Sequence, residues 1–167
     1  MRPPALRRQT GAAIDVPFKL LISVVIVTMA TAILFPALQA YQRSEVEHRL
    51  ALTLAEIEAA AISVHHHPGS SRSVVIDVPS SGGFRLESMS IGGDLRAPPA
   101  EVSTIGWRLS SGTTGTQLVI TTTGPLPMAS TEHGELVIDR FPCLIILEAK
   151  VAPPGGHYSA FVQVSVV

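Results

Sequence analysis

The sequence contains a single cysteine, Cys143, so no disulfide bond can form within the chain. Any folded domain must therefore be stable without covalent cross-links. Aromatic residues are also scarce, at 5% of the chain with one tryptophan. This composition gives no indication of an aromatic-rich adhesive surface.

Charge is low and evenly divided between the two signs. The chain has 12 Lys and Arg residues against 13 Asp and Glu residues, and the formal net charge is −1. No block of like charge occurs. A nucleic-acid-binding surface is typically basic, so this balance argues against one, and we expect no nucleic-acid partner.

Sequence motifs for catalysis or metal binding are missing as well. The chain has no Gly-x-Ser-x-Gly nucleophile motif and no paired Cys/His spacing. His65, His66 and His67 are adjacent, but they lie at a predicted helix end without other convergent ligands, so we expect a solvated helix terminus. Cys143 follows Pro142 in an apolar run and is expected to be a core residue. We therefore predict a protein that is not an enzyme and has no catalytic, cofactor or metal site.

A long apolar run near the N-terminus is the most prominent feature that the sequence does have. The run Leu20–Phe35 carries no charged residue. Its only polar residues are Ser23, Thr28 and Thr31. Extended to Tyr41, the run would form about 33 Å of helix, at about 1.5 Å per residue. That length crosses a hydrocarbon core of about 30 Å, so we predict a membrane-spanning helix.

Three arginines precede the apolar run: Arg2, Arg7 and Arg8. Basic residues tend to stay on the cytoplasmic side of a membrane helix. We therefore expect a single-pass membrane protein with its N-terminus in the cytoplasm and the chain after Tyr41 outside it.

Three ordinary targeting signals compete for this segment. A cleavable secretory signal needs small residues before the cut, but Leu38-Gln39-Ala40 places leucine at one of those positions. A twin-arginine signal has the Arg7-Arg8 pair, but polar residues follow it instead of apolar ones. An uncleaved anchor fits physically and leaves Gly11 and Asp15 without a role.

The stretch from Arg7 through Gly11, Ala12 and Asp15 to Lys19 resembles the class III signal of type IV pilins and archaeal pilin-like proteins. In that family a short basic leader ends in glycine, and cleavage before the apolar run leaves the run in the mature protein. The resemblance implies a leader Met1–Gly11, with a cut after Thr10 as the alternative, and a mature chain starting at Ala12. The bacterial pattern has a phenylalanine-like first residue and a glutamate at position five, whereas the archaeal pattern accepts Ala12 and Asp15.

The family resemblance also implies partners and a role for Asp15. The partners are a prepilin-type peptidase, a platform protein, an assembly ATPase and other pilin-like subunits in a homo- or hetero-oligomer. Asp15 would pair with the new α-amino group of Ala12, in the same chain or in a neighbour. Alternatively, Asp15 lies at the headgroup level and caps the helix start. Lys19 lies one turn further on, within reach of Asp15 on the same helix face.

The helical pattern continues beyond the apolar run, past an interior proline. Pro36 should kink or locally melt the helix, because it removes one backbone hydrogen bond and clashes with the preceding turn. An apolar stripe follows, formed by Val46, Leu50, Leu54, Ile57, Ala61 and Val64. It could cover a sheet of the same chain or face neighbouring helices. Pro68 and Gly69 should end the helix near His65–Gly69.

From Arg72 onward the sequence pattern is that of β-strands. Seven short runs rich in Val, Ile, Leu and Thr are bounded by Gly, Pro and Ser clusters: Ser73–Val78, Phe84–Ile91, Ile105–Ser110, Gln117–Thr122, Glu135–Ile138, Cys143–Lys150 and Tyr158–Val167. No helical window separates them, which indicates an antiparallel sandwich or curled sheet. Tyr158–Val167 alternates as a strand with one buried face should. Leu144–Leu147 is continuously apolar, so we expect a central strand covered on both faces.

The sequence thus predicts an α+β protein: a long N-terminal helix, half membrane-spanning and half amphipathic, followed by an antiparallel β-sandwich-like domain. The expected divisions are a leader at residues 1–11, a membrane or filament-core helix at 12–41, an amphipathic helix at 42–67 and an extracytoplasmic β-domain at 72–167. The expected function is that of a major or minor subunit of a type IV pilus-like surface filament. The alternative is an uncleaved, membrane-anchored β-domain that binds an envelope-layer protein, a sugar or a filament component.

Overall fold

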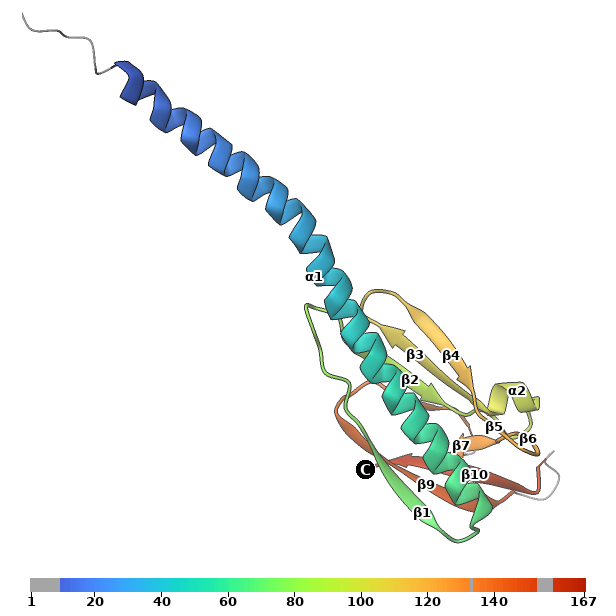
Figure 1. Ribbon diagram of the computed structural model, residues 1–167. Helices are drawn as coiled ribbons and strands as arrows, with labels where there is room; N and C mark the ends of the chain where they lie inside the picture. The colour runs from blue at the N-terminus through green and yellow to red at the C-terminus, as the bar shows by residue number, and fades with distance from the viewer. Residues whose placement is uncertain (1–9, 133, 153–157) are drawn as a thin grey trace, which may run out of the picture. The chain divides into compact units, whose positions relative to one another are not determined.

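The computed structural model describes residues 10–132, 134–152 and 158–167, with side-chain positions from residue 17 onward. Its contacts divide the chain into two compact units, Met1–Tyr41 and Gln42–Val167. One helix, α1 (Thr10–His66), begins in the first unit and ends in the second (Figure 1). The expected α+β class is confirmed as one long helix followed by sheets that are mostly antiparallel.

The second unit contains two four-stranded sheets, a two-stranded hairpin and a short helix (Figure 1). The first sheet has the order β1 (Ser71–Ile76), β9 (Cys143–Val151), β10 (Ala160–Val166), β7 (Met128–Ser130). The second has the order β4 (Thr114–Leu118), β3 (Thr104–Leu109), β2 (Leu86–Ile91), β8 (Leu136–Ile138). The hairpin pairs β5 (Ile120–Thr121) with β6 (Gly124–Pro125), and the short helix is α2 (Pro99–Val102).

The apolar stripe on the second half of α1 covers the sheets of its own chain. Val46, Ile57, Ala61 and Val64 are fully buried, and Leu50 and Leu54 are 3% exposed. All six belong to one hydrophobic cluster with residues from both four-stranded sheets. Each fully buried Val, Leu or Ile contributes about 1.5–3 kcal/mol. The stripe therefore covers the sheets of its own chain and does not face neighbouring helices.

The helix ends at His66 for local reasons. Pro68 has no backbone N–H to continue the ladder. Gly69 follows with φ +83°, a left-handed conformation that glycine adopts without steric cost. The chain then turns directly into β1 at Ser71.

The central strand β9 is less evenly covered than its apolar sequence predicts. It lies between β1 and β10, as expected for a central strand. Ile145 and Leu147 are fully buried, whereas Leu144 and Ile146 on the alternate face are only half-buried. The expectation of full cover on both faces was wrong, because α1 and the second sheet contribute to a core on one side only.

The last strand, β10, is buried on more of its surface than its alternating sequence predicts. Val162 and Val164 belong to the main core, but Phe161 on the other face is also buried. Phe161 packs in a second small cluster with Leu95, Val102 and Ala129. The expectation of one buried face was therefore wrong at Phe161, because the segment containing α2 covers the outer face there.

Three short elements, β7, β6 and α2, were not expected from the sequence, whereas β5 lies in the predicted run Gln117–Thr122. The strand β7 pairs in parallel with β10, whereas the other strand pairs among the described residues are antiparallel. The helix α2 has only four residues, and β5 and β6 have two each. Strands this short have no measurable alternation, so periodicity does not detect them. The break between β4 and β5 occurs at Val119, which is fully buried and donates its N–H to the Ser103 carbonyl.

Gly92 permits the close approach between β7 and the turn that follows β2. Gly92 has φ +73°, and a Cβ atom there would collide with the Met128 carbonyl. The neighbouring Gly93 N–H donates to the same carbonyl at 3.1 Å. A larger residue at position 92 would therefore separate β7 from the turn after β2.

The buried stripe leads to a first prediction. Ile57→Ala removes a fully buried side chain, and such truncations cost about 2–5 kcal/mol because they leave a cavity. Leu52→Ala is the matched control on the same helix, since Leu52 is 52% exposed and its loss should change stability by less than about 0.5 kcal/mol. Urea unfolding followed by the fluorescence of Trp107, the only tryptophan, measures both. Equal losses would contradict the intramolecular core.

A buried hydroxyl leads to a second prediction. Within the described residues, Ser103 is fully buried and its hydroxyl has no hydrogen-bond partner. Ser103→Ala removes this unsatisfied group, so we expect unchanged stability or a gain of about 1 kcal/mol.

The control for that substitution is Ser130→Ala. Ser130 is also buried, but its hydroxyl accepts hydrogen bonds from the N–H groups of Glu132 and Gly134, both at 3.3 Å. Its removal should therefore destabilise the protein in the same urea experiment. A larger loss for Ser103→Ala than for Ser130→Ala would mean that the Ser103 hydroxyl has a bonded partner.

Candidate functional site

The first half of α1 has an apolar surface that the described part of the chain does not cover. The large apolar side chains from Phe18 to Tyr41 are 41–73% exposed. The most apolar 18-residue window has a mean hydropathy of 2.4, and none of it is buried. This helix is long and apolar enough to cross a membrane.

The few hydroxyl groups on this surface are turned back onto the helix. Ser23 donates to the Lys19 carbonyl at 2.9 Å, and Thr31 donates to the Val27 carbonyl at 2.8 Å. Thr28 donates to the Val24 carbonyl at 2.7 Å. These bonds satisfy the hydroxyl donors locally, so the surface can enter an apolar environment without losing hydrogen bonds to water.

The predicted processing and assembly residues lie at the start of α1. Gly11, Ala12 and Asp15 are within the helix, but their side chains lie outside the described ones, as does the segment 1–9 that would form most of the leader. Lys19 is exposed on the helix surface. Cleavage after Gly11 and the pairing of Asp15 therefore stay predictions.

The helix continues through both prolines, Pro17 and Pro36, so neither one ends it. Proline lacks the N–H that would bond to the carbonyl four residues earlier. At Pro36 that carbonyl belongs to Ala32, in the middle of the apolar surface. The helix is continuous at Pro36, so the structure does not have the local melting expected there. The kink stays a prediction.

The histidine run lies at the C-terminal end of α1. His67 Nδ1 lies 2.9 Å from the Ser63 carbonyl, and the rings of His65 and His66 meet edge to face at 5.9 Å. Burial, and secondarily the charge of His66, lowers the pKa of His65. Within residues 10–132, 134–152 and 158–167, no group of three or more His, Cys, Asp or Glu residues is placed to hold a metal ion.

Cys143 and Tyr158 also have altered environments. Burial raises the pKa of the Cys143 thiol, which packs against the main core at the start of β9. Burial likewise raises the pKa of Tyr158, whose hydroxyl donates to the Ala97 carbonyl at 3.2 Å. A raised thiol pKa disfavours the reactive thiolate, so neither group has the environment of an activated nucleophile.

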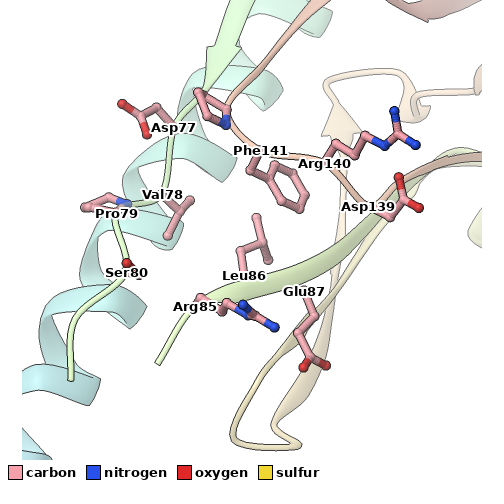
Figure 2. Close-up of a pocket in the computed structure, with 11 residues that line it drawn as sticks. Asp77, Val78, Pro79, Ser80, Arg85, Leu86, Glu87, Asp139, Arg140 and Phe141 are labelled. Carbon is pink, nitrogen blue, oxygen red and sulfur yellow. The ribbon is translucent and has the colours of Figure 1, made fainter. Parts of the chain in front are cut away.

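The second unit has an open groove with a volume of about 730 Å³, which was not predicted from the sequence. It lies where three segments meet: the chain after β1, the start of β2 and the connection from β8 to β9 (Figure 2). Its floor includes the buried Val78 and Leu86 and the half-buried Phe141. In Figure 2 the side chains of Leu86 and Phe141 point toward each other at the centre.

Charged side chains surround this apolar floor. Arg85 and Glu87 come from the start of β2, Asp139 and Arg140 from the β8–β9 connection, and Asp77 from the chain after β1. All five residues are exposed. In the sequence, the groove is marked locally by Leu86 between the charged residues Arg85 and Glu87. This pattern is common in surface strands, so it does not identify a groove.

Comparison with known proteins provides no further assignment. No protein-family model, no curated protein and no solved structure matches this chain.

Proposed function

We propose that the protein is a structural subunit, major or minor, of a type IV pilus-like surface filament. In this proposal a prepilin-type peptidase cleaves after Gly11, and the mature chain keeps α1 from Ala12 onward. Before assembly the chain is a single-pass membrane protein with a cytoplasmic N-terminus and an extracytoplasmic second unit. The two sheets and the covering half of α1 then form a sandwich-like head.

One observation carries the proposal: the two halves of α1 have different surfaces. The stripe from Val46 to Val64 is buried against its own sheets, whereas the large apolar side chains from Phe18 to Tyr41 stay exposed among the described residues. Leaving that many large apolar side chains in water would cost on the order of tens of kcal/mol. Lipid covers them before assembly, and the same helices of neighbouring subunits cover them in a filament.

The hydroxyl pattern supports the same exchange of environment. Ser23, Thr28 and Thr31 are already hydrogen-bonded within the helix. Transfer from lipid to a helix bundle therefore requires no new polar partner for these side chains. A platform protein and an assembly ATPase would supply the work of extraction from the membrane.

The alternative function is an uncleaved anchor that holds the β-domain outside the membrane. An anchor uses the same apolar helix, but it needs neither a cleavage site at Gly11 nor an acidic residue at position 15. The two functions therefore differ in their response to substitutions at these positions.

The assembly proposal leads to a third prediction. Asp15→Ala should leave cleavage and membrane insertion intact but strongly reduce filaments or oligomers. Its carboxylate would otherwise pair with the Ala12 α-amino group, and breaking a buried pair costs about 3–5 kcal/mol. Asp15→Glu keeps the charge and should assemble nearly as well. Sedimentation and electron microscopy of sheared surface material measure assembly.

A second variant separates processing from assembly. Gly11→Val should block the peptidase and keep the protein in the membrane at its full-length mass. An anchored binding domain is indifferent to both changes. Parental mass, localisation and assembly in both variants would remove the filament proposal and leave the anchor.

A further inference from the structure

We propose that the groove between the chain after β1, the start of β2 and the β8–β9 connection is a binding site for a neutral carbohydrate chain. This inference does not depend on filament assembly, since an anchored domain could use the same groove. Its volume of about 730 Å³ lies within the range of about 300–1,000 Å³ that is typical of ligand sites.

The charged side chains of the rim are available to a ligand. Arg85, Glu87, Asp139, Arg140 and Asp77 are exposed, and their side chains make no hydrogen bond or ion pair with the described part of the protein. Together the guanidinium groups offer several N–H donors and the carboxylates several acceptor oxygens.

The alternation of charge on the rim favours a neutral ligand. Arg85 and Glu87 are two residues apart, and Asp139 and Arg140 are adjacent. A phosphate or a carboxylate that approached either arginine would also meet a nearby acidic side chain. A cationic ligand would likewise meet an arginine. Sugar hydroxyls avoid this conflict, because each one both donates and accepts hydrogen bonds.

The floor suits the apolar face of a sugar ring. The side chains of Phe141 and Leu86 point toward each other at the centre of the groove, and charged residues on the same three segments lie around this pair, with the carboxylates of Asp77 and Glu87 directed outward (Figure 2). Ligand sites commonly combine such an aromatic and aliphatic surface with a few polar groups that fix orientation. Because the groove is open rather than enclosed, it would accept part of a chain rather than a single sugar.

An irregularity in β2 sets the position of one rim residue. In the pairing of β2 with β3, Leu86 lies opposite Leu109 and Ser88 opposite Arg108, so Glu87 has no partner. Such a bulge redirects a side chain and is frequent beside binding sites. Here it leaves Glu87 exposed on the rim while Leu86 and Met89 stay buried.

The test uses the full chain in micelles of lauryldimethylamine oxide, a detergent without a sugar headgroup. Cellohexaose, mannohexaose and chitohexaose are titrated separately while backbone amide NMR shifts are recorded. We expect at least one of them to bind with a Kd below about 1 mM, with the largest amide shifts at residues 77, 78, 80, 85–87 and 139–141. Glu87→Gln and Arg140→Gln should each weaken that binding by about tenfold, because each removes a charged hydrogen-bonding partner.

Matched controls are Glu135→Gln and Arg72→Gln, exposed residues that do not line the groove. They should bind like the parent. The proposal is overturned if no oligosaccharide shifts these amides at about 10 mM, or if controls and groove variants lose binding equally. It is also overturned if a peptide of alternating Arg and Glu binds in the groove where the sugars do not, because the groove would then be a protein-docking site.

Discussion

The apolar surface from Phe18 to Tyr41 imposes the main constraint on this protein. A helix satisfies its own backbone hydrogen bonds, so it is stable in lipid or in a bundle of apolar helices. Water provides no comparable environment for side chains that are 41–73% exposed. In the proposed function, this surface contacts lipid before assembly and other apolar helices in a filament.

The second unit must then fold without help from that surface. With one cysteine it has no disulfide, and its stability rests on a core built from α1 and both four-stranded sheets. One helix therefore carries two patterns. From Leu20 to Phe35 it has no charged residue on any side, whereas its second half has a buried apolar stripe from Val46 to Val64 and exposed charged residues on its other faces. A change of environment along the helix explains both patterns.

The groove lies in the second unit, at the ends of strands rather than on α1. A site there leaves the exposed apolar surface and the core-forming stripe of the helix unchanged. In a filament of such subunits, the helices would supply the shared axis and each head could present its own groove. Assembly and ligand binding would then depend on separate residues, and each can be altered without the other.

The sequence predicted the parts of the fold that have a long period. The apolar run and the stripe extend over many residues, and the helix ends near the predicted His65–Gly69. A strand of the structure overlaps each of the seven predicted runs. It did not predict β7 or α2, which are too short to have a period. The burial of Phe161 and the half-exposure of Leu144 depend on which distant segment covers each sheet face. The groove was missed for the same reason, since three separate segments form it.

The N-terminus of the native protein tests the central claim most directly, that α1 is retained after processing and covered by lipid or neighbouring helices. Intact-mass and N-terminal sequencing of material from membranes and from sheared surface filaments would determine it. The account predicts a chain that starts at Ala12 in both fractions. A chain that keeps Met1, or has lost only that residue, would contradict processing. A chain that starts at Tyr41 would mean that the apolar helix is discarded and that the mature protein is a secreted domain.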